Sequence, residues 1–284
     1  KNKWLSVPEI IVHSSNIGAA KMALDVGTSN QKRYLKRFGM LSPAEIELLE
    51  VGAPLTPDHW REINTMTIAF GHGIAVSPLQ LAMGTGALVN GGILFNATLV
   101  KLAKGAKPAG VNVIRPQTSQ MIRSLMRLVV RQGTGKKAEV PGYFVGGKTG
   151  TADKPGVDQR GYEKSRRISS FVAAFPITTP NYVVVALLDE PKGTKATHGY
   201  ATGGWVAAPV VHRIIRQMVP IVGIEPSNKV ETRIMPNDAL FISQSQNNGR
   251  KPTKTEHQTS LLEKRINEFL RSTKRPRGRA VATN

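Results

Sequence analysis

The residues best suited to chemistry in this sequence are the four in Lys148-Thr149-Gly150-Thr151. Lys148 supplies a compact positive charge, and the hydroxyls of Thr149 and Thr151 can donate hydrogen bonds to a carboxylate. Gly150 has no side chain, so a ligand can lie directly against the backbone there. An amide N–H on the edge of such a strand can also stabilise an oxyanion. The pattern indicates a binding site for a carboxylate beside a reacting carbonyl; a purely structural polar strand end would have the same composition.

A second candidate is Ser14-Ser15-Asn16, which stands just before a segment with helical periodicity. Residues of these types often cap a helix by accepting hydrogen bonds from its first amides. They could equally provide a hydroxyl that relays a proton and an amide that fixes a peptide group of a substrate. His13 precedes Ser14, but adjacent residues seldom face each other, so a surface histidine is favoured over a Ser–His pair.

The same lysine and threonine also complete a phosphate-loop pattern, because the segment 142–149 reads Gly, four residues, Gly-Lys-Thr. The segment 185–190 looks like the magnesium-binding strand of such nucleotide hydrolases. That interpretation requires a strand before Gly142 and a helix directly after Thr149. Pro155, Gly156 and Gly161 argue against this helix, so a nucleotide hydrolase is the less favoured alternative.

Periodicity and turn residues predict the elements that must position these residues. We expect helices after Asn16 up to Gly27, from Pro78 to Gly91-Gly92, around Met121–Val129 up to Gly133-Thr134-Gly135, and from Val206 to near Pro220. We expect strands over Tyr143–Thr151, Ile168–Phe175 and Tyr182–Asp189, the last two joined by a short turn and therefore antiparallel. Helices followed by consecutive antiparallel strands and a closing helix predict an α+β fold.

The composition is that of a globular chain of 284 residues, with 40% hydrophobic residues, no cysteine and a net charge of +20. The basic residues are spread along the chain, and no aromatic residues interleave the last basic run, so no specific nucleic-acid site is expected. Six histidines lack metal-ligand spacing, and neither a metal nor a cofactor is expected. His72 and His198 lie in glycine-rich loops, and a place in a cleft is the less favoured interpretation for each.

Composition also predicts the domain organisation. Residues 1–226 carry the periodic segments, whereas 227–284 is polar and basic and is expected to be a largely disordered tail with a short helix over 260–271. The boundary is placed near Pro226. The first residue is Lys1 rather than Met, so we expect a piece of a longer chain.

Five segments, in the order found here, resemble the transpeptidase domain of class B penicillin-binding proteins, and within it the cell-division type. Ser-x-Asn and Lys-Thr-Gly are two of the three motifs of the serine acyltransferases that react with penicillin. The match covers about residues 4 to 222. The segments are Ser14-Ser15-Asn16-Ile17-Gly18; Phe70-Gly71-His72-Gly73 with Ser77-Pro78-Leu79-Gln80-Leu81-Ala82; Gly133-Thr134-Gly135-Lys136; Gly147-Lys148-Thr149-Gly150-Thr151-Ala152; and Asp189-Glu190-Pro191-Lys192-Gly193.

The resemblance implies an antiparallel sheet flanked by helices, the fold shared with serine β-lactamases. It also implies a serine that attacks the D-Ala-D-Ala end of a peptidoglycan stem peptide, releases D-alanine and passes the acyl group to an amine of a neighbouring strand. The implied partners are peptidoglycan stem peptides, β-lactams and other cell-division proteins. The implied location is the extracytoplasmic face of the cytoplasmic membrane, with an anchor upstream of this sequence.

The resemblance also implies roles for individual residues. Ser14 would shuttle a proton beside the leaving amine, and Asn16 would hold the donor peptide. Lys148 would supply positive charge near the acylation site, while Thr149 and Thr151 would hold the terminal carboxylate. The N–H of Thr151 would form half of the oxyanion hole.

The family's first motif, Ser-x-x-Lys, carries the nucleophile and its activating lysine and is expected several tens of residues before Ser14, upstream of Lys1. Ser29-Asn30-Gln31-Lys32 has the same letters but follows Ser14, in the polar segment after Gly27, and we interpret it as chance. Because a serine needs an adjacent base to become a nucleophile, this chain alone is expected to be inactive. The alternative to an enzyme is a domain that lost its nucleophile and serves as a scaffold for partners.

Overall fold

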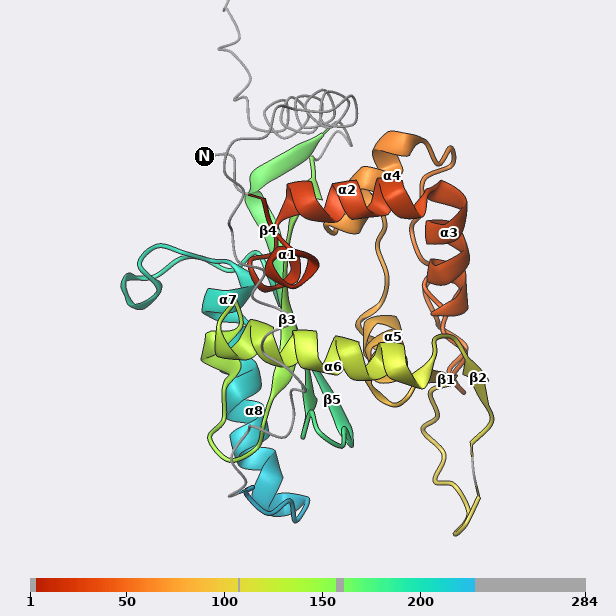
Figure 1. Cartoon of the computed structure of the whole chain (residues 1–284), viewed down its shortest axis with the longest axis vertical. Coiled ribbons are helices and arrows are strands. Elements are labelled where there is room, and N and C mark those ends of the chain that lie inside the picture. Colours follow the sequence, from red (N-terminus) through yellow and green to blue (C-terminus); the bar gives the residue numbers. More distant parts are fainter. Residues whose placement is uncertain (1–3, 107, 157–160, 228–284) are drawn as a thin grey trace, which may run out of the picture.

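The computed structural model of the chain describes residues 4–106, 108–156 and 161–227. The expected tail and its helix over 260–271 lie outside these residues. Helices and one short hairpin come first along the chain, three consecutive strands follow, and two helices close the described part (Figure 1). The fold is therefore α+β, with helices on both faces of an antiparallel sheet, as expected.

The sheet that carries Lys148-Thr149-Gly150-Thr151 has the order β3-β4-β5 among the described residues, and both pairings are antiparallel. β3 spans Gly146–Pro155, β4 spans Tyr162–Phe175 and β5 spans Tyr182–Asp189. The prediction for β5 is confirmed, and β4 begins six residues earlier than expected. β3 is therefore the strand at one edge of this sheet.

The predicted strand over 143–151 is wrong at both ends. Phe144 has a φ of 43°, which interrupts an extended backbone, and its carbonyl accepts the N–H of Ile177 rather than joining the ladder. The strand accordingly starts at Gly146. It continues past Thr151 to Pro155 because β4 is long enough to pair with it, with a register shift between Asp153 and Lys154.

All four expected helices are present, and only the starts of the last two differ clearly from the prediction. α2 (Asn16–Val26) ends at Gly27, whose φ is 81°, and α5 (Pro78–Val89) begins with a capping box formed by Ser77 and Gln80. α6 (Pro116–Arg131) begins earlier than its apolar period indicated. α8 (Ala208–Ile221) starts after Val206 because Pro209 favours a new first turn, and Val206 instead ends the short α7 (Gly203–Val206).

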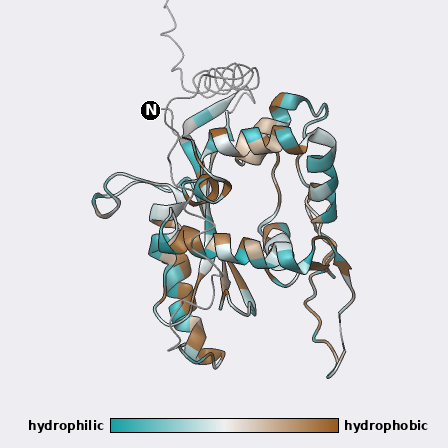
Figure 2. Ribbon diagram, in the orientation of Figure 1, coloured by the Kyte–Doolittle hydropathy of each residue, from teal (hydrophilic) through white to brown (hydrophobic). Residues whose placement is uncertain are grey.

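Several described elements were not predicted from the sequence. They are α1 (Val7–Val12), α3 (Thr28–Arg37), α4 (Glu62–Ala69), the hairpin of β1 (Ile93–Phe95) and β2 (Gly110–Asn112), and the 3-10 turns η1 (Lys136–Ala138) and η2 (Lys195–Thr197). α3 buries none of its residues, so it has no apolar period to detect; most of it is teal in Figure 2. α1 carries a capping box between Ser6 and Glu9 that a closer search for local signals would have found.

The sheet is held between two helical layers. α8 packs on the face that carries Phe171 and Phe175, both fully buried, while α5 and α6 cover the face that carries Ala174. Burial of these side chains is the main favourable free-energy contribution to this half of the fold. In the described residues no helix has the length and apolarity that crossing a bilayer requires.

An ion pair between a buried arginine and a half-buried glutamate fixes α6 against the start of β3. Arg127 is 3% exposed and donates to both carboxylate oxygens of Glu139, at 2.5 and 3.0 Å. Its guanidinium also donates to the carbonyl of Val145 at 2.7 Å. Because a buried charge without partners is strongly unfavourable, these contacts hold the segment before β3 in one position.

Close backbone approach ties α7 to the middle of the sheet. A β-carbon at position 203 would lie 2.3 Å from the carbonyl oxygen of Ser170 and 2.4 Å from that of Gly150. Gly203 is therefore the residue that lets α7 rest on β3 and β4. At Gly86, inside α5, an added β-carbon would have no atom of another element within 4 Å.

We expect Gly203→Ala to lower the free energy of unfolding by about 1–3 kcal/mol, because the new methyl group must displace backbone. In the matched control, Gly86→Ala should raise the free energy of unfolding by about 0.5–1 kcal/mol, because alanine favours the helix interior. Urea denaturation of both variants measures the difference. Equal effects of the same sign would contradict the close packing of α7.

Candidate active site

The two motifs identified in the sequence meet in one hydrogen bond. Lys148, on β3, donates from Nζ to Oγ of Ser14 at 2.6 Å, across 134 positions of sequence. Ser14 lies in the turn between α1 and α2 and has a φ of 54°, a left-handed conformation that serine adopts at a cost of about 1 kcal/mol. The turn is held by the N–H of Ser15, which donates to the carbonyl of Ile10 at 2.9 Å. The structure therefore fixes the Ser14 hydroxyl at the lysine.

Burial makes Lys148 an unusual lysine. Loss of hydration lowers the pKa of Lys148 from 10.5 to about 8. Within the described residues no carboxylate forms an ion pair with it, and its other hydrogen bonds go to the carbonyl and hydroxyl of Thr149, at 3.0 and 3.4 Å. At neutral pH the group is a partly desolvated cation, so an anionic ligand beside it would gain more than at a hydrated lysine.

The two threonines of the motif keep their hydroxyls near the same place. Oγ1 of Thr151 accepts the N–H of Gly203 at 3.0 Å, so its own proton remains available to a ligand. Oγ1 of Thr149 lies 2.9 Å from Oγ1 of Thr134, which follows α6. Thr134 belongs to a segment that carried the family resemblance, but it was not predicted as a site residue, because only the tertiary structure brings it to Thr149.

The orientation of the β3 backbone follows from its partners. The carbonyl of Thr149 points toward Lys148, and the N–H of Asp153 donates away from β4, to the ring of His72. Alternate residues of a strand turn their backbone groups to the same side, so the N–H and C=O of Thr151 also face the outer edge. Among the described residues no strand pairs with that edge. A peptide-like ligand could therefore pair with it.

Each residue of the Ser14-Ser15-Asn16 segment has a different environment. Oγ of Ser15 accepts the N–H of Gly18 at 3.2 Å, so Ser15 is the residue that caps α2. This leaves Ser14 for Lys148 and leaves the side chain of Asn16 exposed, without a hydrogen bond to the described part of the chain. Asn16 is two residues from Ser14 at the start of α2, and the side-chain hydrogen bonds of Lys148 go to Ser14 and Thr149 instead.

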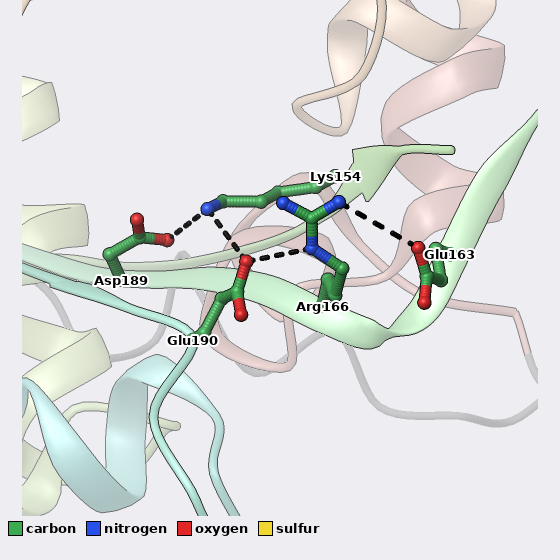
Figure 3. A network of polar contacts seen from close by, with 5 residues as sticks. All are labelled: Lys154, Glu163, Arg166, Asp189 and Glu190. Atoms are coloured by element: carbon green, nitrogen blue, oxygen red, sulfur yellow. Dashed lines mark hydrogen bonds and ion pairs between the residues drawn. The ribbon is translucent and has the colours of Figure 1, made fainter. Parts of the chain in front are cut away.

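A charged network joins the far ends of the three strands (Figure 3). Lys154 lies between Asp189, at 2.5 Å, and Glu190, at 3.0 Å, and Glu190 also accepts from Arg166 at 2.8 Å. Arg166 in turn lies 3.8 Å from Glu163. The hydrogen bond from Arg166 and then that from Lys154 lower the pKa of Glu190 to about 2. This network holds the acidic pair of the segment 189–193 against the β3–β4 hairpin.

The course of the backbone through Lys148 and Thr149 contradicts the phosphate-loop interpretation. Lys148 and Thr149 lie inside β3, and the chain after them continues as a strand instead of starting a helix. No helix N-terminus is available to bind phosphates at this position. The Ser29–Lys32 segment lies in α3, which Figure 1 shows at the far end of α2 from β3. It has no role at the Ser14–Lys148 contact.

The histidines are dispersed. Nδ1 of His212 is 2.6 Å from the carbonyl of Glu139, His198 packs its ring edge-on against Trp205, and His13 is exposed. The described residues contain no group of three or more His, Asp or Glu side chains placed to hold a metal ion. Among the described histidines, His72 is the one with a hydrogen bond to the motif strand, at Asp153.

The fold and the paired Ser-x-Asn and Lys-Thr-Gly motifs define a penicillin-interacting serine acyltransferase type of domain. The family model described as "Penicillin binding protein transpeptidase domain" matches residues 1–216. The chain therefore belongs to the penicillin-binding protein transpeptidase family.

Relatives in other organisms agree with this assignment. The chain is 42% identical over 235 residues to a probable peptidoglycan D,D-transpeptidase FtsI of Caulobacter vibrioides, covering 80% of this chain and 40% of the relative. It is 35% identical to stage V sporulation protein D of Bacillus subtilis, covering 82% of this chain and 37% of that protein. The chain thus spans about two fifths of the length of these relatives.

Solved structures show the same fold. The transpeptidase domain of penicillin-binding protein 3 from Burkholderia pseudomallei superposes with a TM-score of 0.71 at 34% identity, over 80% of this chain and 67% of that one. Penicillin-binding protein 3 of Mycobacterium tuberculosis, in a complex with ampicillin, gives a TM-score of 0.71 at 26% identity, over 79% and 53%.

The desolvation of Lys148 can be measured directly. We expect its ε-methylene resonance, assigned by its loss in Lys148→Arg, to titrate with a midpoint of about 8 in an NMR pH series. Lys36→Arg, a change on the exposed α3, should leave that resonance in place. A midpoint at the ordinary value of 10.5 would contradict the burial of this ammonium group.

Proposed function

We propose that this chain is the C-terminal part of the catalytic domain of a peptidoglycan D,D-transpeptidase, a serine acyltransferase that cross-links stem peptides in septal cell-wall synthesis. The observation that carries the proposal is the 2.6 Å hydrogen bond from Lys148 to Ser14 beside the open edge of β3. The Ser-x-x-Lys motif with the nucleophile is expected upstream of Lys1. The names of the relatives that carry FtsI support the septal role.

Each half-reaction uses the open edge. In acylation, the nucleophilic serine oxygen bonds to the carbonyl carbon of the penultimate D-alanine, and the bond to the terminal D-alanine breaks. The departing amine takes up a proton, and D-alanine leaves. In transfer, an amine of a neighbouring stem peptide attacks the ester, releases the serine and loses a proton, so the new amide is the cross-link.

The chain's own residues bind and orient the donor. The hydroxyls of Thr149 and Thr151 hold the terminal carboxylate, and the Lys148 ammonium supplies positive charge beside it. Gly150 leaves the space in front of the strand open. The N–H of Thr151 forms one half of the oxyanion hole, and the exposed amide of Asn16 holds the peptide bond of the donor.

Ser14 is placed to move the proton. Its oxygen accepts from Lys148, which leaves the Ser14 O–H free to donate to the amine that departs. A cation that donates to this hydroxyl makes its proton more acidic and so favours the relay. Protonation of the leaving amine is general acid catalysis, which contributes about 10²–10⁴-fold to a rate.

β-Lactams are proposed to occupy the same edge, because they present a carboxylate beside a strained amide. The ampicillin complex of the similar Mycobacterium tuberculosis protein supports β-lactam binding. Peptidoglycan stem peptides are the proposed substrates and other cell-division proteins the proposed partners. We place the whole protein on the extracytoplasmic face of the cytoplasmic membrane, with an anchor upstream of this sequence.

Substitutions at the contact test the assigned roles. In the longer protein that carries Ser-x-x-Lys, Lys148→Ala or Ser14→Ala should slow acylation by a fluorescent penicillin at least about tenfold, because each removes a charge-assisted hydrogen bond. Lys36→Ala, on the exposed α3, is the matched control and should acylate at the parent rate. Circular dichroism checks that all variants fold.

Unchanged acylation in both site variants would contradict these roles. A longer protein that folds, carries no Ser-x-x-Lys upstream of Lys1 and does not acylate would instead support the scaffold alternative.

The pH dependence separates two roles for Lys148. Its pKa of about 8 means that the ammonium form is present below that pH and is lost above it. If the charge holds the carboxylate, the second-order rate of penicillin acylation should fall as the pH rises through about 8. A penicillin methyl ester, which lacks the carboxylate, should show a smaller fall. A rate that rises through the same range would assign Lys148 as a base and contradict the proposal.

A further inference from the structure

His72 contacts the motif strand two residues beyond Thr151. Its Nε2 accepts the N–H of Asp153 at 3.4 Å. The ring lies edge-on to Tyr162 of β4, with centroids 4.8 Å apart, and 5.7 Å from Phe70. The backbone N–H of His72 donates to the carbonyl of Thr67 at 3.0 Å, which holds the loop after α4 in place.

The hydrogen bond from Asp153 defines the tautomer of the neutral His72 ring. An imidazole nitrogen accepts a hydrogen bond only when it carries no proton, so Nε2 is the bare nitrogen and Nδ1 carries the proton. Nδ1 is buried and has no hydrogen-bond partner in the described residues. Burial lowers the pKa of His72, while the Asp153 carboxylate acts in the opposite direction. The neutral ring therefore predominates at neutral pH.

Asp153 lies on the same outer edge of β3 as Thr149 and Thr151. Thr149, Thr151 and Asp153 turn their backbone groups to the same outer edge of β3, as the contacts to Lys148 and His72 show. A ligand chain that adds to this edge as a strand would use these groups in order. At Asp153 the hydrogen bond is already made by His72, and the next residue begins the register shift with β4.

We propose that His72 is a positioning residue that closes the open edge of β3 at Asp153, so that an extended ligand pairs at Thr149 and Thr151 and must leave the edge there. The identity of that ligand as the donor stem peptide or the acyl side of a β-lactam rests on the proposed function. The closure itself is a property of this chain and does not depend on catalysis.

The charged and titratable groups at this contact are few. On β3 the Asp153 carboxylate lies near the ring, and Arg167 of β4 is 3.8 Å from that carboxylate. Tyr162 of β4 faces the ring, and burial raises its pKa, so it stays uncharged. Protonation of His72 at acid pH removes the acceptor at Nε2, and the Asp153 N–H is then released to the edge.

Amide hydrogen exchange of the chain, followed by NMR, tests the closure without any ligand. At neutral pH the Asp153 amide should be protected in the parent protein. It should exchange roughly tenfold faster in His72→Ala, which loses the acceptor. In His72→Gln a side-chain oxygen can accept, and protection should return at least in part.

His59→Ala, a change at an exposed histidine, is the matched control and should leave Asp153 unchanged. Comparison of protection factors between neutral and acid pH adds a readout that a purely structural role would not move. Protection at Asp153 should fall with His72 protonation in the parent and stay constant in His72→Gln.

Two results would overturn the inference. One is an Asp153 amide in the parent that exchanges as fast as that of Thr151. The other is an equal loss of protection at Gly150, which pairs with Ser170 inside the sheet, because this would mean general opening of β3 in His72→Ala.

A second measurement connects the closure with ligand choice. In the longer protein with Ser-x-x-Lys, His72→Ala should change the ratio of acylation rates between a penicillin with a short acyl side chain and one with a long, peptide-like side chain. His72→Gln should keep the parent ratio. If the hydrogen-exchange results are as expected but no protein acylates, including the parent, the proposed function is wrong and the closure at Asp153 still holds. If acylation proceeds with an unchanged ratio in His72→Ala, the closure does not select ligands.

Discussion

The ammonium group of Lys148 joins the sheet to the turn between α1 and α2. It is carried by β3, and it donates a hydrogen bond to Ser14 in that turn. A lysine that has lost part of its hydration must recover free energy from its neighbours, and the hydroxyl of Ser14 and the backbone of Thr149 are what the described structure supplies. The left-handed turn at Ser14 is the local cost of this arrangement.

The second constraint is the open edge of β3. An unpaired strand edge in a folded protein attracts other strands, so an exposed one requires a reason or a cover. Here Gly203 lets α7 pack closely on the backbone of β3 and β4. At the outer edge of β3, the N–H of Asp153 donates to His72. What remains open is the short stretch around Thr149 and Thr151. Its length matches a ligand better than it matches a partner sheet.

The elements around this edge are held by different kinds of interaction. Apolar burial dominates between α8 and the Phe171 face of the sheet. The ion pair between buried Arg127 and Glu139 positions the start of β3. The exposed network around Glu190 joins the end of β3 to β4 and to the end of β5. The exposed network is screened by solvent and contributes little to stability, so its effect is on the position of the β3–β4 hairpin.

Local patterns in the sequence determined much of this protein. The α+β class, the strand β5 and the helices α2 and α5 with their caps follow from spacing and turn residues. Motif order predicted Ser14, Asn16, Lys148, Thr149 and Thr151 as site residues, and the structure places Ser14 at Lys148. The rest depended on contacts between residues far apart in sequence. The start of β3 was misplaced because the left-handed Phe144 is set by packing, and α3 was missed because its polar residues face solvent. Only the tertiary structure decided that Ser15 caps the helix while Ser14 meets Lys148, that Thr134 lies at Thr149, and that His72 ends the open edge. Hydrogen bonds and desolvation act over a few ångströms in space, and no local pattern records which distant residues come that close.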